Sequence, residues 1–178
     1  MTPRVALSAL ALTFVAVTLS HVEWRRTDNG PLLVLDGRPL DVLGWLAQQR
    51  NRLQRHCSAV QVLQAGEAAV QAPLAVLKEF SPPASRSARV AGAWALGDWM
   101  LLEVTFAELL PAVVLLQETD KGWDVAPHGV WSGQTHPWQA APLIRAYLSR
   151  QVPRAPVPLL ACFEPRSPAL KAQPGLGD

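Results

Sequence analysis

The stretch HGVWSGQTHPWQ, at residues 128–139, brings together residue types that can carry out catalysis. A serine nucleophile, a histidine base and an orienting aspartate are available in Ser132, His128 or His136, and Asp124. On an extended strand Asp124 and His128 would share a face, because their spacing is even. No GxSxG motif surrounds Ser132, so these residues are catalytic candidates on the basis of type and spacing alone.

The same stretch also contains residue types that bind metals. His128, His136 and Asp124 could in principle act as zinc ligands, but an eight-residue spacing of two histidines matches no zinc motif. The chain has no HExxH, no P-loop and no GxGxxG pattern. We therefore expect no metal and no cofactor.

Tryptophan is abundant, with seven residues against one tyrosine. One interpretation is core packing between a sheet and its helices. The other is an aromatic-lined concavity that receives an apolar ligand or a partner peptide. The candidate residues for such a concavity all fall on predicted strands: Trp94, Trp99, Trp123 and Trp131.

These candidates must be positioned by an antiparallel sheet. Residues 90–106 show the two-residue period of β-strands on either side of Gly97–Asp98. Gly97–Asp98 itself suits a two-residue hairpin turn with glycine first. Residues 111–118 are apolar on both faces, which predicts a strand covered on both sides.

A last strand follows the turn at residues 119–122. Pro127 and Gly129 interrupt it, which predicts an edge strand or a bulge. Together the strands predict a four-stranded antiparallel meander over residues 89–132, in an α+β fold.

Helices are predicted on either side of the meander. The first covers residues 41–56 with Asp41 as its N-cap. Proline suits a first helical turn, which predicts further helices at 73–80 and 142–151. Residues 58–72 fit either a helix or a strand.

The face of the first helix that should point inward is set by its apolar spacing. This face holds Leu43, Leu46, Ala47, Arg50 and Leu53. The outward side should then hold Gln48, Gln49, Asn51, Arg52 and Arg55.

The connecting segments are expected to be less regular. Residues 32–35 predict a short strand before a turn, and residues 81–89 predict a linker. Residues 152–158 are proline-rich and predict an extended segment. The apolar residues 159–163 should dock on the body, and residues 165–178 are predicted to be disordered.

The N-terminus carries an export pattern. Arg4 precedes an apolar, uncharged run from Val5 to Leu19, as in a signal peptide that is later removed. A retained membrane anchor is the alternative, because a helix from Val5 to Val22 would span about 27 Å. A buried helix of the fold is the third interpretation. Residues 1–22 are assigned to this signal or anchor, and residues 23–164 to a single α+β domain.

The cysteines also favour an exported protein. Cys57 and Cys162 are the only two, and an even count in an exported protein favours a disulfide. The alternative is a pair of separate buried thiols.

Charge excludes one class of partner. The formal net charge is only +2, whereas nucleic-acid binders carry a stronger basic excess.

We expect an exported bacterial envelope protein, periplasmic or anchored in the inner membrane, that acts as a non-enzymatic binding or assembly module. Its partners would be an envelope protein and, through an uncleaved N-terminal segment, the membrane. The alternative is a small periplasmic enzyme or apolar-ligand carrier.

Overall fold

The computed structural model describes residues 22–171, and this part of the chain forms two antiparallel sheets and five α-helices. The strands are β1 (Val22–Thr27), β2 (Gly30–Leu35), β3 (Arg38–Leu40), β4 (Gln61–Leu63), β5 (Arg89–Leu96), β6 (Trp99–Thr105), β7 (Ala112–Thr119) and β8 (Gly122–Ser132). The helices are α2 (Val42–Gln54), α3 (Ala68–Phe80), α4 (Ala140–Gln151), α5 (Val157–Ala161), α6 (Pro168–Lys171) and the 3-10 helix η1 (Ala84–Ser87).

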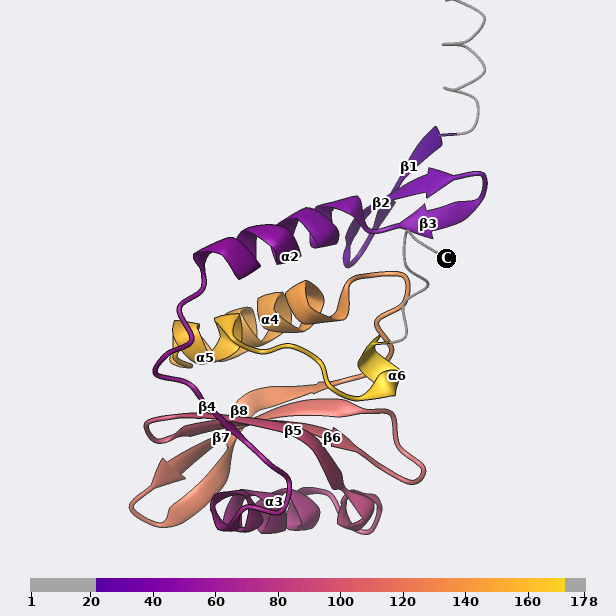
Figure 1. Ribbon diagram of the computed structural model, residues 1–178. Helices are drawn as coiled ribbons and strands as arrows, with labels where there is room; N and C mark the ends of the chain where they lie inside the picture. The colour runs from indigo at the N-terminus through magenta and orange to yellow at the C-terminus, as the bar shows by residue number, and fades with distance from the viewer. Residues whose placement is uncertain (1–21, 172–178) are drawn as a thin grey trace, which may run out of the picture.

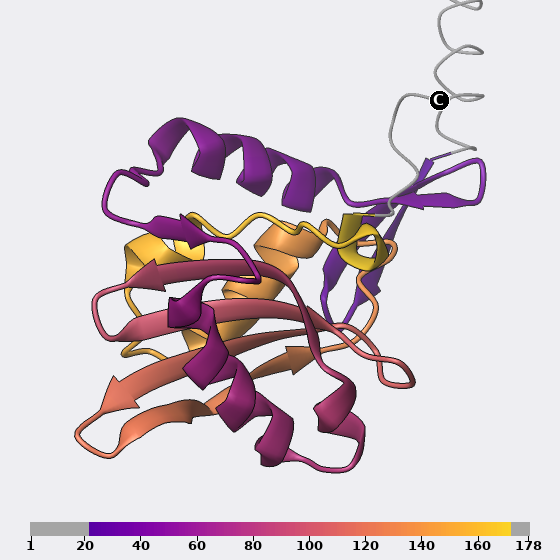
Figure 2. The same cartoon turned by 60° about the horizontal axis from the view of Figure 1, so that its bottom comes forward.

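These elements are arranged in layers around the larger sheet, whose strand order is β4-β5-β6-β7-β8 (Figure 1). Helix α3 and η1 cover one face of this sheet, and α4, α5 and α6 lie over the other. Helix α2 lies outside α4, farthest from the sheet. The small sheet β1-β2-β3 stands beside the start of α2, and Figure 2 shows the same arrangement from another side. The predicted α+β class is therefore confirmed.

The predicted meander is present as β5 to β8. Leu96 pairs with Trp99 across the turn, and Gly97 has a φ of +59°, a backbone conformation that glycine adopts without strain. Residues 112–116 of β7 are all buried, as expected for a strand covered on both sides. Strand β8 lies at the edge of the sheet and contains a bulge, as its proline and glycine predicted.

The sheet nevertheless has five strands, so the predicted number of four was wrong. Residues 61–63 form β4, which pairs with residues 93–95 of β5. This also resolves the segment 58–72, which contains this short strand and then the start of α3. Three residues are too few for a periodic signal, and the pairing partner is about 30 residues away.

Two helices begin earlier than predicted. Helix α3 starts at Ala68 rather than at residue 73, and Pro73 lies inside it. Proline lacks the amide hydrogen of an interior helical bond. Val70 and Leu77 are buried on the same helix, and this packing supports a helix that local preference disfavours. Helix α4 starts at Ala140 rather than at 142.

The C-terminal part is more ordered than its composition indicates. Residues 152–158 make a turn and enter α5 instead of staying extended. Residues 165–171, predicted to be disordered, include α6, and both Ser167 and Leu170 are buried. Residues 172–178 of the predicted tail lie outside the described residues.

The N-terminal lead-in also differs from the expectation, because it contains three paired strands and not one. The predicted signal or anchor lies outside the described residues except for Val22, which begins β1. In residues 22–171 there is no helix with the length and hydropathy needed to cross a membrane.

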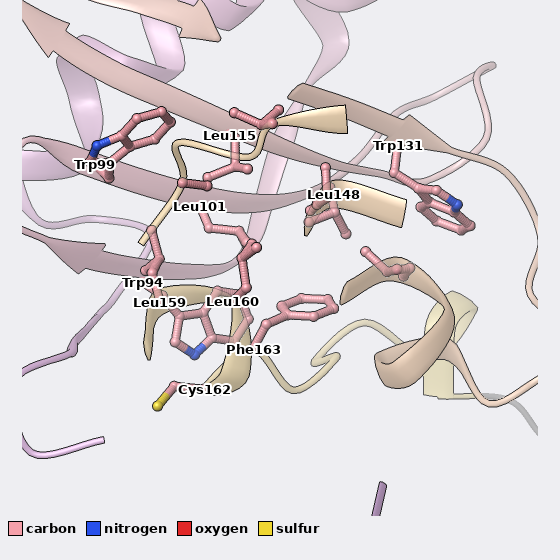
Figure 3. Close-up of a cluster of buried hydrophobic side chains, with 14 of the residues drawn as sticks. Trp94, Trp99, Leu101, Leu115, Trp131, Leu148, Leu159, Leu160, Cys162 and Phe163 are labelled. Atoms are coloured by element: carbon pink, nitrogen blue, oxygen red, sulfur yellow. The ribbon is translucent and has the colours of Figure 1, made fainter. Parts of the chain in front are cut away.

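Two hydrophobic clusters fill the space on either side of the larger sheet. Figure 3 shows the cluster under α4 and α5, where Trp94 and Trp131 lie with Leu148, Leu159 and Phe163. The other cluster lies under α3 and contains alternate residues of the same strands, such as Met100, Leu102 and Val104. The predicted docking of residues 159–163 is confirmed, since Leu159 and Phe163 are fully buried.

Candidate functional site

The catalytic candidates are spread along β8 and the loop that follows it. Asp124 pairs in register with Gln117 of β7, and its side chain is exposed. His128 and His136 are also exposed. The Ser132 hydroxyl donates a hydrogen bond to the Pro111 carbonyl at 3.3 Å.

The bulge in β8 changes the geometry that made Asp124 and His128 a pair. Val125 lies opposite Leu116 and Val130 opposite Val114, so five steps along β8 match two along β7. His128 lies within this bulge and has a φ of +60°. The regular alternation that would place positions 124 and 128 on one face is therefore interrupted. Within residues 22–171, no group of three or more His, Cys, Asp or Glu side chains is placed to hold a metal ion.

The four sheet tryptophans do not line one concavity. Trp94, Trp99 and Trp131 are buried in the cluster under α4 and α5, whereas Trp123 packs on the opposite side of the sheet. Trp94 makes an edge contact with Phe163 at 5.1 Å between ring centroids. Core packing, the first of the two interpretations, describes these contacts.

The surface of α2 is the largest departure from the sequence pattern. Its predicted inward face is exposed, with Leu43 at 47%, Leu46 at 50% and Leu53 at 88% of full exposure. The only buried residue of the helix is Gln48. Helix α2 is therefore turned with its polar side toward the protein body.

Polar contacts hold this inverted face. Gln48 donates from its amide nitrogen to both oxygens of Glu164, at 2.8 and 2.9 Å, and accepts from Arg145 of α4. Arg55 makes an ion pair with Glu164 at 2.6 Å. Asn51 donates to the Ala161 carbonyl at 2.9 Å. Arg52 also makes an ion pair with Glu164, at 3.3 Å. We call the residues that make these contacts the polar seam: Gln48, Asn51, Arg52, Arg55, Arg145 and Glu164.

The electrostatics of the polar seam depend on Glu164. Burial lowers the pKa of Arg145 to about 10, and the charges of Arg55 and Arg52 act in the same direction, against the attraction of Glu164. Its guanidinium stays charged at neutral pH. Burial alone would raise the pKa of the Glu164 carboxyl, but hydrogen bonds and charges from Arg52, Arg55 and Gln48 outweigh burial and lower it below 4.5. Glu164 is therefore the one carboxylate that acts on all three of these guanidinium groups, two by ion pairs and Arg145 by its charge.

Both ends of α2 are fixed as well. The Asp41 carboxylate caps the helix, as predicted, by accepting from the Gly44 amide at 2.8 Å, and it also accepts from the Gln139 amide at 2.8 Å. Beyond the other end, the predicted disulfide joins Cys57 to Cys162 with Cα atoms 5.8 Å apart. Such a bond is typical of proteins exported to an oxidising compartment.

Glu103 is a further buried polar residue that the sequence reasoning missed. It lies on β6 and is fully buried. Its two oxygens accept hydrogen bonds from the backbone amides of Arg166 and Ser167, both at 2.7 Å. These bonds hold the C-terminal segment on the sheet. A charged residue inside the apolar run WMLLEVTF was the available signal, because such a position is buried only with partners.

The strip that α2 leaves exposed is the candidate binding surface. We call it the docking strip and define it as Leu43, Leu46, Ala47, Arg50 and Leu53. Full burial of a leucine contributes about 1.5–3 kcal/mol, so covering three exposed leucines would release several kcal/mol. Large exposed apolar patches mark interaction sites, and these three leucines lie on one face of α2.

Comparison of the chain with protein-family models, with curated proteins and with solved structures finds no significant match.

Proposed function

We propose that this chain is an exported envelope protein, facing the periplasm, that works as a non-enzymatic binding module through the docking strip. The single observation that carries the proposal is the inverted orientation of α2. Its polar face makes the contacts with the body, and its leucines face outward.

The way α2 is held supports a binding role. The two fixed ends and the polar seam hold the helix in place, while Leu43, Leu46 and Leu53 stay about half exposed or more. A surface helix that is already positioned loses little conformational freedom when a partner covers it, which favours binding. The docking strip is thus a preorganised apolar surface.

Two further observations support export. The apolar run from Val5 to Leu19 after Arg4 has the composition of a signal or anchor segment. The disulfide between Cys57 and Cys162 is stable in an oxidising compartment such as the periplasm.

Thiol accessibility in intact spheroplasts tests both parts of the proposal. The probes are Ala47→Cys in the docking strip and Ala75→Cys on α3. Both positions are exposed helical alanines, and the helices that carry them, α2 and α3, lie on opposite sides of the molecule (Figure 1). Both native cysteines are in the disulfide, so the introduced thiol is the one that reacts with a membrane-impermeant maleimide.

We expect the thiol at 75 to react without lysis and the thiol at 47 to react at least about fivefold more slowly, because a covered strip reacts only while it is free. Denaturation should make the two rates equal. Labelling at 75 only after lysis would contradict export. Equal rates at 47 and 75 in intact spheroplasts would contradict a docking role.

A further inference from the structure

We infer that the docking strip rests on the lipid surface of a membrane with anionic headgroups. This inference rests on the proposed function, because it names the occupant of the same strip. Three observations favour lipid: the charge of α2, the exposure of Trp24, and the position at which the described chain begins.

The charge of α2 suits an anionic surface. The helix VLGWLAQQRNRLQ contains no acidic residue, and Arg50 lies among the exposed leucines. Leucine together with arginine is typical of helices that lie in the membrane interface. An arginine at this depth can keep its stem in apolar surroundings while its guanidinium reaches the headgroups. A second copy of α2 would bring like charges together without a carboxylate on either helix.

A tryptophan of β1 is far more exposed than the buried tryptophans of the larger sheet. Trp24 on β1 is 56% exposed, whereas Trp94 is 3% exposed. Trp45 on α2, 45% exposed, lines a hollow with Gln48 and Glu164 and is not part of the docking strip. Tryptophan is favoured at the boundary between lipid and water, where its ring and its indole N–H find different surroundings.

The start of the described chain lies on the same side of the molecule as the docking strip. Strand β1 begins at Val22, and β1 and α2 are on the same side of the molecule, away from α3 (Figures 1 and 2). The apolar run Val5–Leu19 immediately precedes this point in the sequence, and Arg25 and Arg26 follow it. A segment held in the bilayer 24 residues before Leu43 would keep the strip at high effective concentration near lipid, so weak interfacial binding is sufficient.

Depth-dependent quenching tests the inference. The full-length Ala47→Cys and Ala75→Cys proteins are labelled with the environment-sensitive fluorophore NBD and reconstituted into vesicles of phosphatidylcholine and phosphatidylglycerol. A nitroxide quencher is placed on the lipid acyl chain just below the headgroup. The same two proteins are also studied in native envelope membranes supplied with the quencher lipid.

The expected result is that the fluorophore at 47 shifts to the blue and loses at least about half of its emission to the lipid quencher, while the fluorophore at 75 loses less than about a tenth. If position 47 is shielded in native membranes but exposed in pure-lipid vesicles, a protein occupies the strip; the lipid inference then fails and the binding function stands. If position 47 is as exposed as position 75 in both preparations, both proposals fail. Shielding at 47 in the vesicles without lipid quenching would indicate self-association and would also overturn the inference.

Discussion

Removal of the disulfide between Cys57 and Cys162 is expected to lower the free energy of unfolding by about 4–5 kcal/mol, because the bond closes a loop of 105 residues in the unfolded chain. The bond also ties the segment after α2 to the segment after α5. Its loss should therefore loosen α2 more than the central sheet, since α2 otherwise depends on polar contacts while β6 and β7 are buried on both faces.

Urea unfolding of a variant with both cysteines replaced by serine measures the global effect, and hydrogen exchange measures the local one. Wild-type protein in reductant is the matched control, because it lacks the bond but keeps the sulfur atoms. A loss of less than about 1 kcal/mol in both forms would contradict the chain-entropy argument. Equal acceleration of amide exchange in α2 and in β6 would contradict the local argument.

Replacement of Glu164 by glutamine is expected to lower the free energy of unfolding by about 2–3 kcal/mol at neutral pH. The carboxylate is the acceptor for Gln48, Arg52 and Arg55, and it is the counter-charge near the buried Arg145. Removing one partner of a largely buried ion pair leaves uncompensated charge, and partial exposure of Glu164 reduces the usual loss. Glu79→Gln is the matched control, because its pair with Arg86 is exposed on both sides; its effect should stay within about 0.5 kcal/mol.

The same carboxyl gives stability a defined pH dependence. The pKa of Glu164 in the folded protein lies below its ordinary value of 4.5. Its contribution is therefore fully present above that value and is lost as the pH falls through the folded pKa. Urea midpoints at about pH 7 and about pH 3.5 should differ more for wild type than for Glu164→Gln. Equal differences in the two proteins would show that Glu164 is not the group that titrates.

Local patterns predicted the central sheet well. The turn at Gly97–Asp98 and the apolar segment at residues 112–116 are signals that lie within a few residues of one another, so each could be recognised without knowing the rest of the fold. The cap of α2 by Asp41 and the cysteine pair were predictable for the same reason or by simple counting.

The orientation of α2 could not be predicted in this way. Periodicity identified its two faces correctly, but the assignment of the apolar face to the interior assumes that nothing else pairs with the polar one. The partners of Gln48 are Arg145 and Glu164, which lie 97 and 116 residues away. A contact of this separation leaves no trace in the local pattern.

The catalytic candidates on β8 and the buried Arg145 could not be judged from the sequence for a related reason. Asp124 and His128 were paired by residue type and even spacing, but the bulge of β8 interrupts the alternation between them, and nothing in their spacing indicates how large that bulge is. Arg145 was overlooked because it lies among the apolar residues of α4, where a charged residue is a sign of a buried partner.

A comparison of two single variants tests most directly whether α2 turns its leucines outward, which is the observation that the proposed function depends on. If it does, Leu53→Ser should change the free energy of unfolding by less than about 0.5 kcal/mol. Gln48→Leu should lower it by about 2–3 kcal/mol, because Arg145 and Glu164 lose a buried hydrogen-bond partner. The opposite result, a loss of about 2 kcal/mol for Leu53→Ser with Gln48→Leu neutral or stabilising, would place the leucines in the interior and contradict the docking strip.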